Sequence, residues 1–147
     1  MADHKISSEI DALPVGPELN ALVAEYVMLW QHVDSYYGNP LAKGWDGFWD
    51  RDSQWVKWIT IPDSDNEDIA KPWSPSTDIA TAFEMEDEIK RRGLSDHYSL
   101  ELMELIPQKP GGYSMSEKCF WFAHASPEIR CRAALRMILK IELENGT

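Results

Sequence analysis

The chain has 147 residues, of which 44% are hydrophobic, and its 25 acidic and 14 basic side chains give a formal net charge of −11. This length suits a single domain spanning 1–147 that buries roughly two-thirds of its unfolded surface, and the apolar fraction excludes a disordered chain. Because an acidic surface repels phosphate backbones, we expect no direct binding to nucleic acid. A partner protein with a basic surface would suit this charge.

The first residues, 1–15, are polar and lack the apolar core of a signal peptide. No uninterrupted apolar run approaches the ~20 residues that cross a bilayer, so we expect a cytoplasmic protein that makes no membrane contact. Residues 1–15 are expected to form a flexible segment. Cys119 and Cys131 have neither the number nor the spacing of a disulfide framework or a metal site, and we expect both to be reduced and buried.

Residues 17–30, "PELNALVAEYVMLW", predict a helix that begins at Pro17. Its apolar side chains recur with helical spacing, which places Leu22, Tyr26 and Trp30 on one face. We expect this face to be buried against a sheet.

The stretch 44–58, "GWDGFWDRDSQWVKW", contains four tryptophans and predicts a hairpin whose connection lies at 50–53. Its second strand, within 54–61, carries apolar side chains on both faces, which is typical of a strand covered on both sides. Large rings on both faces favour the core. Trp45 and Trp49 lie beside acidic residues, and if exposed they would mark a partner or ligand surface.

The polar segment 62–75 begins with the D-x-D pattern of a calcium-binding loop. Asp68 stands where that loop needs glycine, and Ser74 stands where it needs a bidentate carboxylate. We therefore expect no metal site.

Residues 76–93 predict a second helix, with Ser76 and Thr77 as cap candidates and basic residues followed by glycine at its end. Two antiparallel strands are expected next, within 97–107 and 118–125. A third helix is expected from Ser126 to about residue 143, and its Arg132 could pair with Asp78.

The resulting order is α-β-β-α-β-β-α. A sheet that is apolar on both faces, together with amphipathic helices, predicts an α/β (α+β) three-layer helix-sheet-helix sandwich with a mainly antiparallel sheet.

Three stretches, "ELNALVAEYVMLW" (18–30), "STDIATAFEMEDEI" (76–89) and "ASPEIRCRAALRMIL" (125–139), resemble the three helices of the phage ABA sandwich domain family. The order and spacing of the three make the resemblance specific, although it covers little of the strands. Leu29 departs from the family pattern, because glycine usually precedes the tryptophan. The resemblance implies a phage or prophage origin and a helix-sheet-helix sandwich, and it implies no catalytic residue.

No nucleophile with its base, phosphate-binding loop or metal-ligand cluster stands out in the sequence. His124 precedes the helix start at Ser126, where an anion could bind, but a structural role for it is the simpler interpretation. Trp45, Asp46, Trp49 and Asp50 are the candidate binding residues, and we expect neither a cofactor nor a catalytic group.

We therefore expect a small, acidic, non-enzymatic phage accessory protein that binds a host protein in the host cytoplasm. The alternative is a carrier or sponge for a small nucleotide-like ligand, with tryptophans stacking on its ring and a helix start holding its phosphate. The negative charge argues against this alternative.

Overall fold

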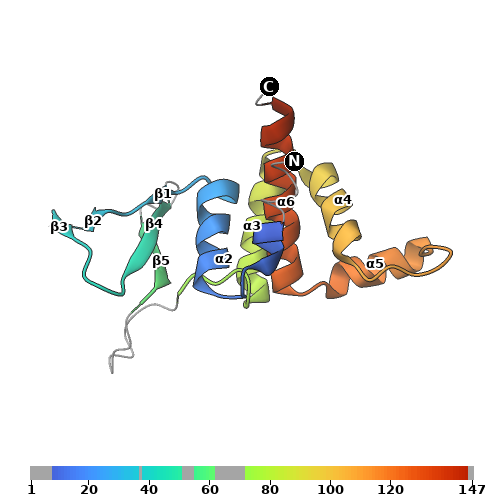
Figure 1. Ribbon diagram of the computed structural model, residues 1–147, viewed down its shortest axis with the longest axis horizontal. Coiled ribbons are helices and arrows are strands. Elements are labelled where there is room, and N and C mark those ends of the chain that lie inside the picture. Colours follow the sequence, from blue (N-terminus) through green and yellow to red (C-terminus); the bar gives the residue numbers. More distant parts are fainter. Residues whose placement is uncertain (1–7, 37, 51–54, 62–71, 146–147) are drawn as a thin grey trace.

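The computed structural model describes residues 8–36, 38–50, 55–61 and 72–145. Its helices gather at the centre and on one side, and its strands lie on the other side of α2 (Figure 1). After a short helical segment at 8–12, the elements follow in this order: α2 (Pro17–Leu22), η1 (Val23–Val27), β1 (Gln31–His32), β2 (Ser35–Tyr36), β3 (Asn39–Pro40), β4 (Asp46–Asp50), β5 (Trp55–Thr60), α3 (Ile79–Arg91), α4 (Ser95–Leu105), α5 (Met115–His124) and α6 (Pro127–Asn145).

The helices predicted at 17–30, 76–93 and 126–143 are confirmed as α2 with η1, α3 and α6. The long helix α6 occupies the middle of the molecule, where α2, η1, α3 and α4 pack against it (Figure 1). Its inward-facing side chains are buried, including Cys131, Ala134 and Ile138, and they join Leu19 and Val23 in one hydrophobic core. Apolar burial by α6 therefore organises the helical part of the fold.

The cap of α3 is Asp78 and not the neighbouring hydroxyl residues. Asp78 Oδ1 accepts a hydrogen bond from the Ala80 N–H at 3.1 Å, and Asp78 Oδ2 accepts one from the Thr81 hydroxyl at 2.8 Å. Ser76 instead links two other segments, because its N–H donates to Asn20 Oδ1 and its Oγ accepts from the Gly16 N–H. These bonds fix the start of α2 against the start of α3.

The predicted tryptophan hairpin is confirmed: β4 and β5 pair antiparallel, with Asp50 opposite Trp55. β1 pairs with the other edge of β4, which gives a three-stranded sheet in the order β1-β4-β5, and β2 with β3 forms a separate two-stranded ribbon. The proposed connection at 50–53 lies largely outside the described residues, as does the acidic loop up to residue 71.

The predicted three-layer sandwich is wrong. Residues 97–107 and 118–125 are mostly helical, in α4 and α5, so the described strands form only the two small sheets of the N-terminal half. The alternation of Tyr98, Leu100 and Leu102 suggested a strand, but Tyr98 and Leu102 are also one helical turn apart and both are buried in α4. Leu100, on the other side of the helix, is 68% exposed.

The face of the first helix is only partly buried. Trp30 is buried and packs against Trp73 with ring centroids 4.7 Å apart, whereas Tyr26 is 41% exposed and Leu22 is half-buried. The expectation for Tyr26 is therefore wrong, because this side of η1 faces a hollow beside α6 and no sheet. One cysteine expectation is also wrong: Cys131 is buried but Cys119 is exposed on α5, and both are free thiols.

Arg132 does not pair with Asp78. Its guanidinium is nearly buried and donates to the carbonyls of Ile10 and Leu13, at 2.5 and 2.7 Å, and to Glu128 at 2.7 Å. This arginine thereby attaches residues 8–13 to α6. Across the described residues, no helix is both long enough and apolar enough to span a membrane.

Candidate functional site

The two faces of the β4–β5 hairpin differ in what covers them. Phe48 and Ile59 are buried and belong to the main core, while Trp49, Val56 and Trp58 on the opposite face remain partly exposed. The strand pairing places Trp49 opposite Val56 and Gly47 opposite Trp58, so these residues share the outer face. Sheet alternation thus divides the aromatic residues between the core and the surface.

Gly47 allows the Trp58 ring to lie across β4. A Cβ at this position would be 2.8 Å from the Trp58 side chain and 2.9 Å from Val56 Cγ1, which is closer than carbon atoms normally approach. The indole can therefore cover the strand only because residue 47 has no side chain.

Three further aromatic contacts complete the outer face. Trp58 meets Trp45 edge-on with centroids 4.9 Å apart and meets Tyr36 edge-on at 5.7 Å, and Tyr36 also lies 6.1 Å from Trp49. Trp45 and Trp58 line a shallow hollow of about 250 Å³ together with Tyr36 and the segment 40–42. We call Tyr36, Trp45, Trp49 and Trp58 the aromatic face.

The tryptophans expected mainly in the core are therefore divided. Trp30 and Trp73 are core residues, the three tryptophans of the aromatic face are half-buried, and Trp55 at the end of β5 is 71% exposed. Partly exposed tryptophans are therefore concentrated on this surface, and tryptophan is enriched among the residues that contribute most to binding energy at protein interfaces.

Acidic groups lie on the Phe48 side of the hairpin, where His32 is opposite Phe48 in the ladder and the two ring centroids are 5.2 Å apart. His32 Nε2 lies 2.5 Å from Asp46 Oδ1, and His32 Nδ1 lies 3.3 Å from Asp34 Oδ1, so one imidazole bridges two carboxylates. Although burial alone would lower it, the hydrogen bonds to Asp46 and Asp34 raise the pKa of His32 above its ordinary value. Asp50 is half-buried at the end of β4.

The structure brings the four predicted binding residues onto one hairpin. Trp45 and Trp49 both contribute to the aromatic face, Asp46 pairs with His32, and Asp50 is opposite Trp55 in the ladder. Sequence reasoning missed Tyr36 and His32, because turn-forming residues such as Gly38, Asn39 and Pro40 dominate the segment between the first helix and the hairpin. β1 and β2 have two residues each, which is too short to give a periodic signal in the sequence.

A second group of exposed apolar side chains lies on α5, in which no residue is buried. Phe120 is 56% exposed, stacks on His124 with centroids 4.1 Å apart and meets Trp121 edge-on. His124 Nδ1 is 2.8 Å from the Phe120 carbonyl oxygen, and Ser126 Oγ accepts from the Ile129 N–H, so neither group is arranged around an anion.

The described residues contain no group of three or more His, Cys, Asp or Glu side chains that could hold a metal ion. The aromatic face carries no nucleophile beside a base, and its chemistry is that of contact and charge. No protein-family model, curated protein or solved structure matches this chain.

Proposed function

We propose that this protein is a small acidic accessory protein of a phage or prophage, and that it binds a host protein through the hairpin without catalysing a reaction. The observation that carries this proposal is the aromatic face, which is partly exposed and lies on the same hairpin as Asp46 and Asp50. Interfaces draw most of their binding energy from such aromatic side chains.

The partner surface that fits this hairpin is basic around an apolar centre. Asp34 is almost fully exposed, and the whole chain carries a formal charge of −11, so a cationic partner is steered toward it. The rings of Trp45 and Trp58 around the hollow would receive an apolar or cationic side chain, and an arginine or lysine could lie over an indole ring. The cytoplasm of the host is the expected place of action.

The proposal is tested by capturing host proteins on the immobilised chain and comparing variants of the hairpin. Trp45→Ala should mainly speed dissociation of the captured protein, because it removes an anchor. Asp46→Asn with Asp50→Asn should mainly slow association, because it removes charges that guide the encounter.

Matched controls separate the hairpin from the rest of the surface. Leu100→Ala removes an exposed apolar side chain on α4, and Glu142→Gln with Glu144→Gln removes two exposed charges from α6. Both controls should bind like the parent protein. The proposal is wrong if the hairpin variants bind like the parent while keeping its unfolding temperature. It is also wrong if the association rate is the same at 10 and 150 mM salt, over which the Debye length changes about fourfold.

The hollow beside Trp45 supports a second candidate, a carrier for a small flat ligand. Its volume of about 250 Å³ lies below the roughly 300–1,000 Å³ typical of small-molecule sites, and its lining residues include no basic side chain that would hold a phosphate. Titration with AMP, adenosine and adenine, followed by tryptophan fluorescence, discriminates the two functions. Saturable quenching that Trp45→Ala abolishes would favour the carrier.

A further inference from the structure

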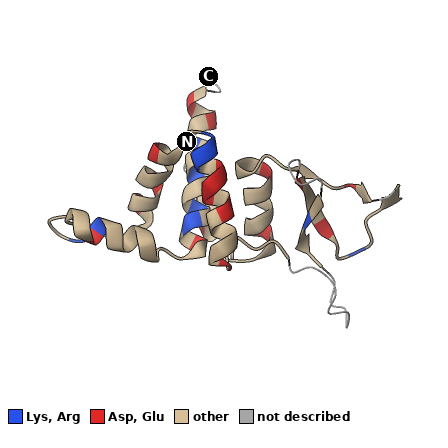
Figure 2. Ribbon diagram, turned by 180° about the vertical axis from the view of Figure 1, so that it is seen from behind, with Lys and Arg blue, Asp and Glu red and all other residues tan. Residues whose placement is uncertain are grey.

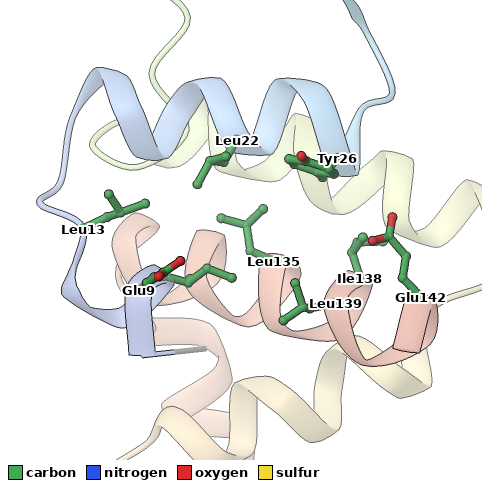
Figure 3. Close-up of a pocket in the computed structure, with 9 residues that line it drawn as sticks. Glu9, Leu13, Leu22, Tyr26, Leu135, Ile138, Leu139 and Glu142 are labelled. Atoms are coloured by element: carbon green, nitrogen blue, oxygen red, sulfur yellow. The ribbon is translucent and has the colours of Figure 1, made fainter. Parts of the chain in front are cut away.

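A second and larger hollow lies on the helical side of the molecule, between the helical segment 8–12, α2 with η1, and α6 (Figure 3). It has a volume of about 400 Å³, within the usual range for small-molecule sites. Leu135 and Ile138 of α6 are buried beneath it, and Leu13 and Leu22 project toward it from the other elements.

The wall formed by residues 9–13 is held in place independently of any ligand. Arg132 of α6 donates to the carbonyls of Ile10 and Leu13, and the carboxylate of Glu128 fixes the same guanidinium. Arg136 Nη1 lies 3.8 Å from Asp11 Oδ2 on the side of the same segment. The hollow is therefore largely preformed, which reduces the ordering cost of binding.

The polar groups that line the hollow are acidic. Glu9 and Glu142 stand toward opposite sides of the row of leucines in Figure 3, and no lysine, arginine or histidine is among the lining residues. Within the described residues, neither carboxylate has an ion pair or hydrogen bond. Tyr26, 41% exposed, presents its ring between them.

We propose that this hollow binds a small amphipathic organic cation, with an apolar body against Leu22, Leu135 and Leu139 and a protonated amine beside Glu142 and the Tyr26 ring, while Glu9 adds negative potential from the opposite side. Apolar area drives entry of the body, while the two carboxylates and the face of the phenol select a positive head group. An anion of the same shape would meet both carboxylates and is disfavoured. The site lies apart from the aromatic face, so it does not depend on the proposed function.

The test uses three probes of one shape, 1-adamantylamine, 1-adamantanol and 1-adamantanecarboxylate, titrated into the full chain at pH 7 by calorimetry. We expect the amine to bind about tenfold more tightly than the alcohol and the carboxylate to bind more weakly than both. Amide resonances of Leu22 and Leu139 should shift on binding, which places the probe in this hollow.

Two variants with the same change of net charge test the selection. Glu9→Gln with Glu142→Gln should bring the amine and the alcohol within about twofold of each other. Glu18→Gln with Glu25→Gln changes two exposed carboxylates of α2 and η1 that do not line the hollow, and it should preserve the preference. Leu22→Trp should weaken binding of all three probes by filling the space.

Several outcomes would overturn the proposal. They are an absence of binding by the amine at millimolar concentration, equal binding of amine and carboxylate, or a preference that the Glu9/Glu142 variant retains. The chain could instead self-associate, with concentration-dependent shifts of the Leu22 and Leu139 amide resonances that the amine does not reverse. That result would show that a second copy of the chain occupies the hollow. Contacts from residues 1–7 to Leu22 in the free protein would assign the hollow to the chain's own N-terminal segment.

Discussion

Arg130 and Arg132 are separated by one residue in α6, and both guanidinium groups are largely buried. Arg130 donates to the carbonyls of Phe122 and Ala125 at the end of α5, and it pairs with Glu86 of α3 at 2.7 Å. Tyr98 of α4 donates its hydroxyl to the same carboxylate. Burial, together with the neighbouring charge of Glu86, raises the pKa of Tyr98, so the phenol keeps its proton. One buried cation thus joins α3, α4, α5 and α6.

Glu86→Gln is expected to destabilise the protein by about 3 kcal/mol, because it leaves the buried Arg130 charge without its counterion. The backbone carbonyls that still accept from Arg130 keep the cost at the low end for a broken buried pair. Urea unfolding measures the change. The matched control is Glu88→Gln, whose partner Arg91 is exposed, and it should cost less than about 1 kcal/mol. Equal losses in the two variants would contradict this account.

His32 gives a pH dependence with a defined sign. Its pKa is raised in the folded state by Asp46 and Asp34, so the stabilisation from these pairs is complete below the ordinary value of 6.5 and is lost as pH rises through the folded value. The stability difference between the parent and His32→Gln should therefore shrink between pH 6 and pH 9. NMR titration of the imidazole should show a lower pKa for His32 in Asp46→Asn than in the parent. An unchanged pKa would contradict the pairing of His32 with Asp46.

At the scale of elements, the residues at the ends of helices are the clearest sequence signals of secondary structure. The helix formed by α2 and η1 ends where Leu29 adopts a left-handed conformation, φ 58°, and the Trp30 N–H donates to the Ala24 carbonyl. A six-residue closure of this kind normally uses glycine, which has no Cβ to clash. Leu29 is therefore a strained residue at a position where glycine is the usual choice.

Leu29→Gly should stabilise the protein by up to about 1 kcal/mol. The left-handed conformation costs a leucine roughly 1–2 kcal/mol, and the greater chain entropy that glycine loses on folding offsets part of this gain. The leucine is 51% exposed, so little apolar burial is lost. Thermal and urea unfolding test this result. Leu29→Ala, which keeps a Cβ in the same conformation, serves as the control and should not gain stability. A loss of stability in the glycine variant would show that the leucine side chain contributes more than its exposure suggests.

Three helices and one hairpin were predictable because their signals are local, such as proline at the start of α2 and α6 and the acid-to-base order along α3. α4 and α5 were not. In α4 the inward face carries Glu101, whose charge is balanced by Lys140 and Arg136 of α6, and such a partner cannot be read from a single segment. For α5 a usable signal was present: Ser114 and Glu117 form a capping box, in a stretch interpreted as a loop.

The candidate site was predictable only in part for the same reason. Trp45 and Trp49 were identified from their position beside acidic residues, but the partners that surround them depend on strand register. Trp58 was expected in the core of a covered sheet, and it is half-exposed because the helices gather on the other side of α2 (Figure 1). Absence of the outer layer thus changes a core residue into a surface one.

At the scale of the whole molecule, the charge is distributed unevenly. Basic side chains of α6 face acidic partners on α4, α3 and the segment 8–12, while the hairpin and α2 carry acidic residues with few cations (Figure 2). Several basic side chains of α6 are therefore neutralised by ion pairs within the helical part.

Metal removal should leave the molecule unchanged. The segment 62–75 has Asp68 where a calcium-binding loop needs glycine and Ser74 where it needs a bidentate carboxylate, and the cysteines lack partners with metal-site spacing. Incubation with EDTA is expected to leave the melting temperature within about 1 °C of the untreated protein. Recovery of a lowered melting temperature by added calcium or zinc would show that the loop binds a metal after all.

The two thiols differ in exposure, so the chain can be labelled selectively at one cysteine. Burial raises the pKa of Cys131 to about 12, so its reactive thiolate is scarce at neutral pH, whereas Cys119 is exposed on α5. A maleimide dye should therefore attach at one position without mutagenesis. In a Trp121→Phe variant, which removes the indole beside the dye on α5, energy transfer from the hairpin indoles to the fluorophore would report movement of the hairpin relative to the helices.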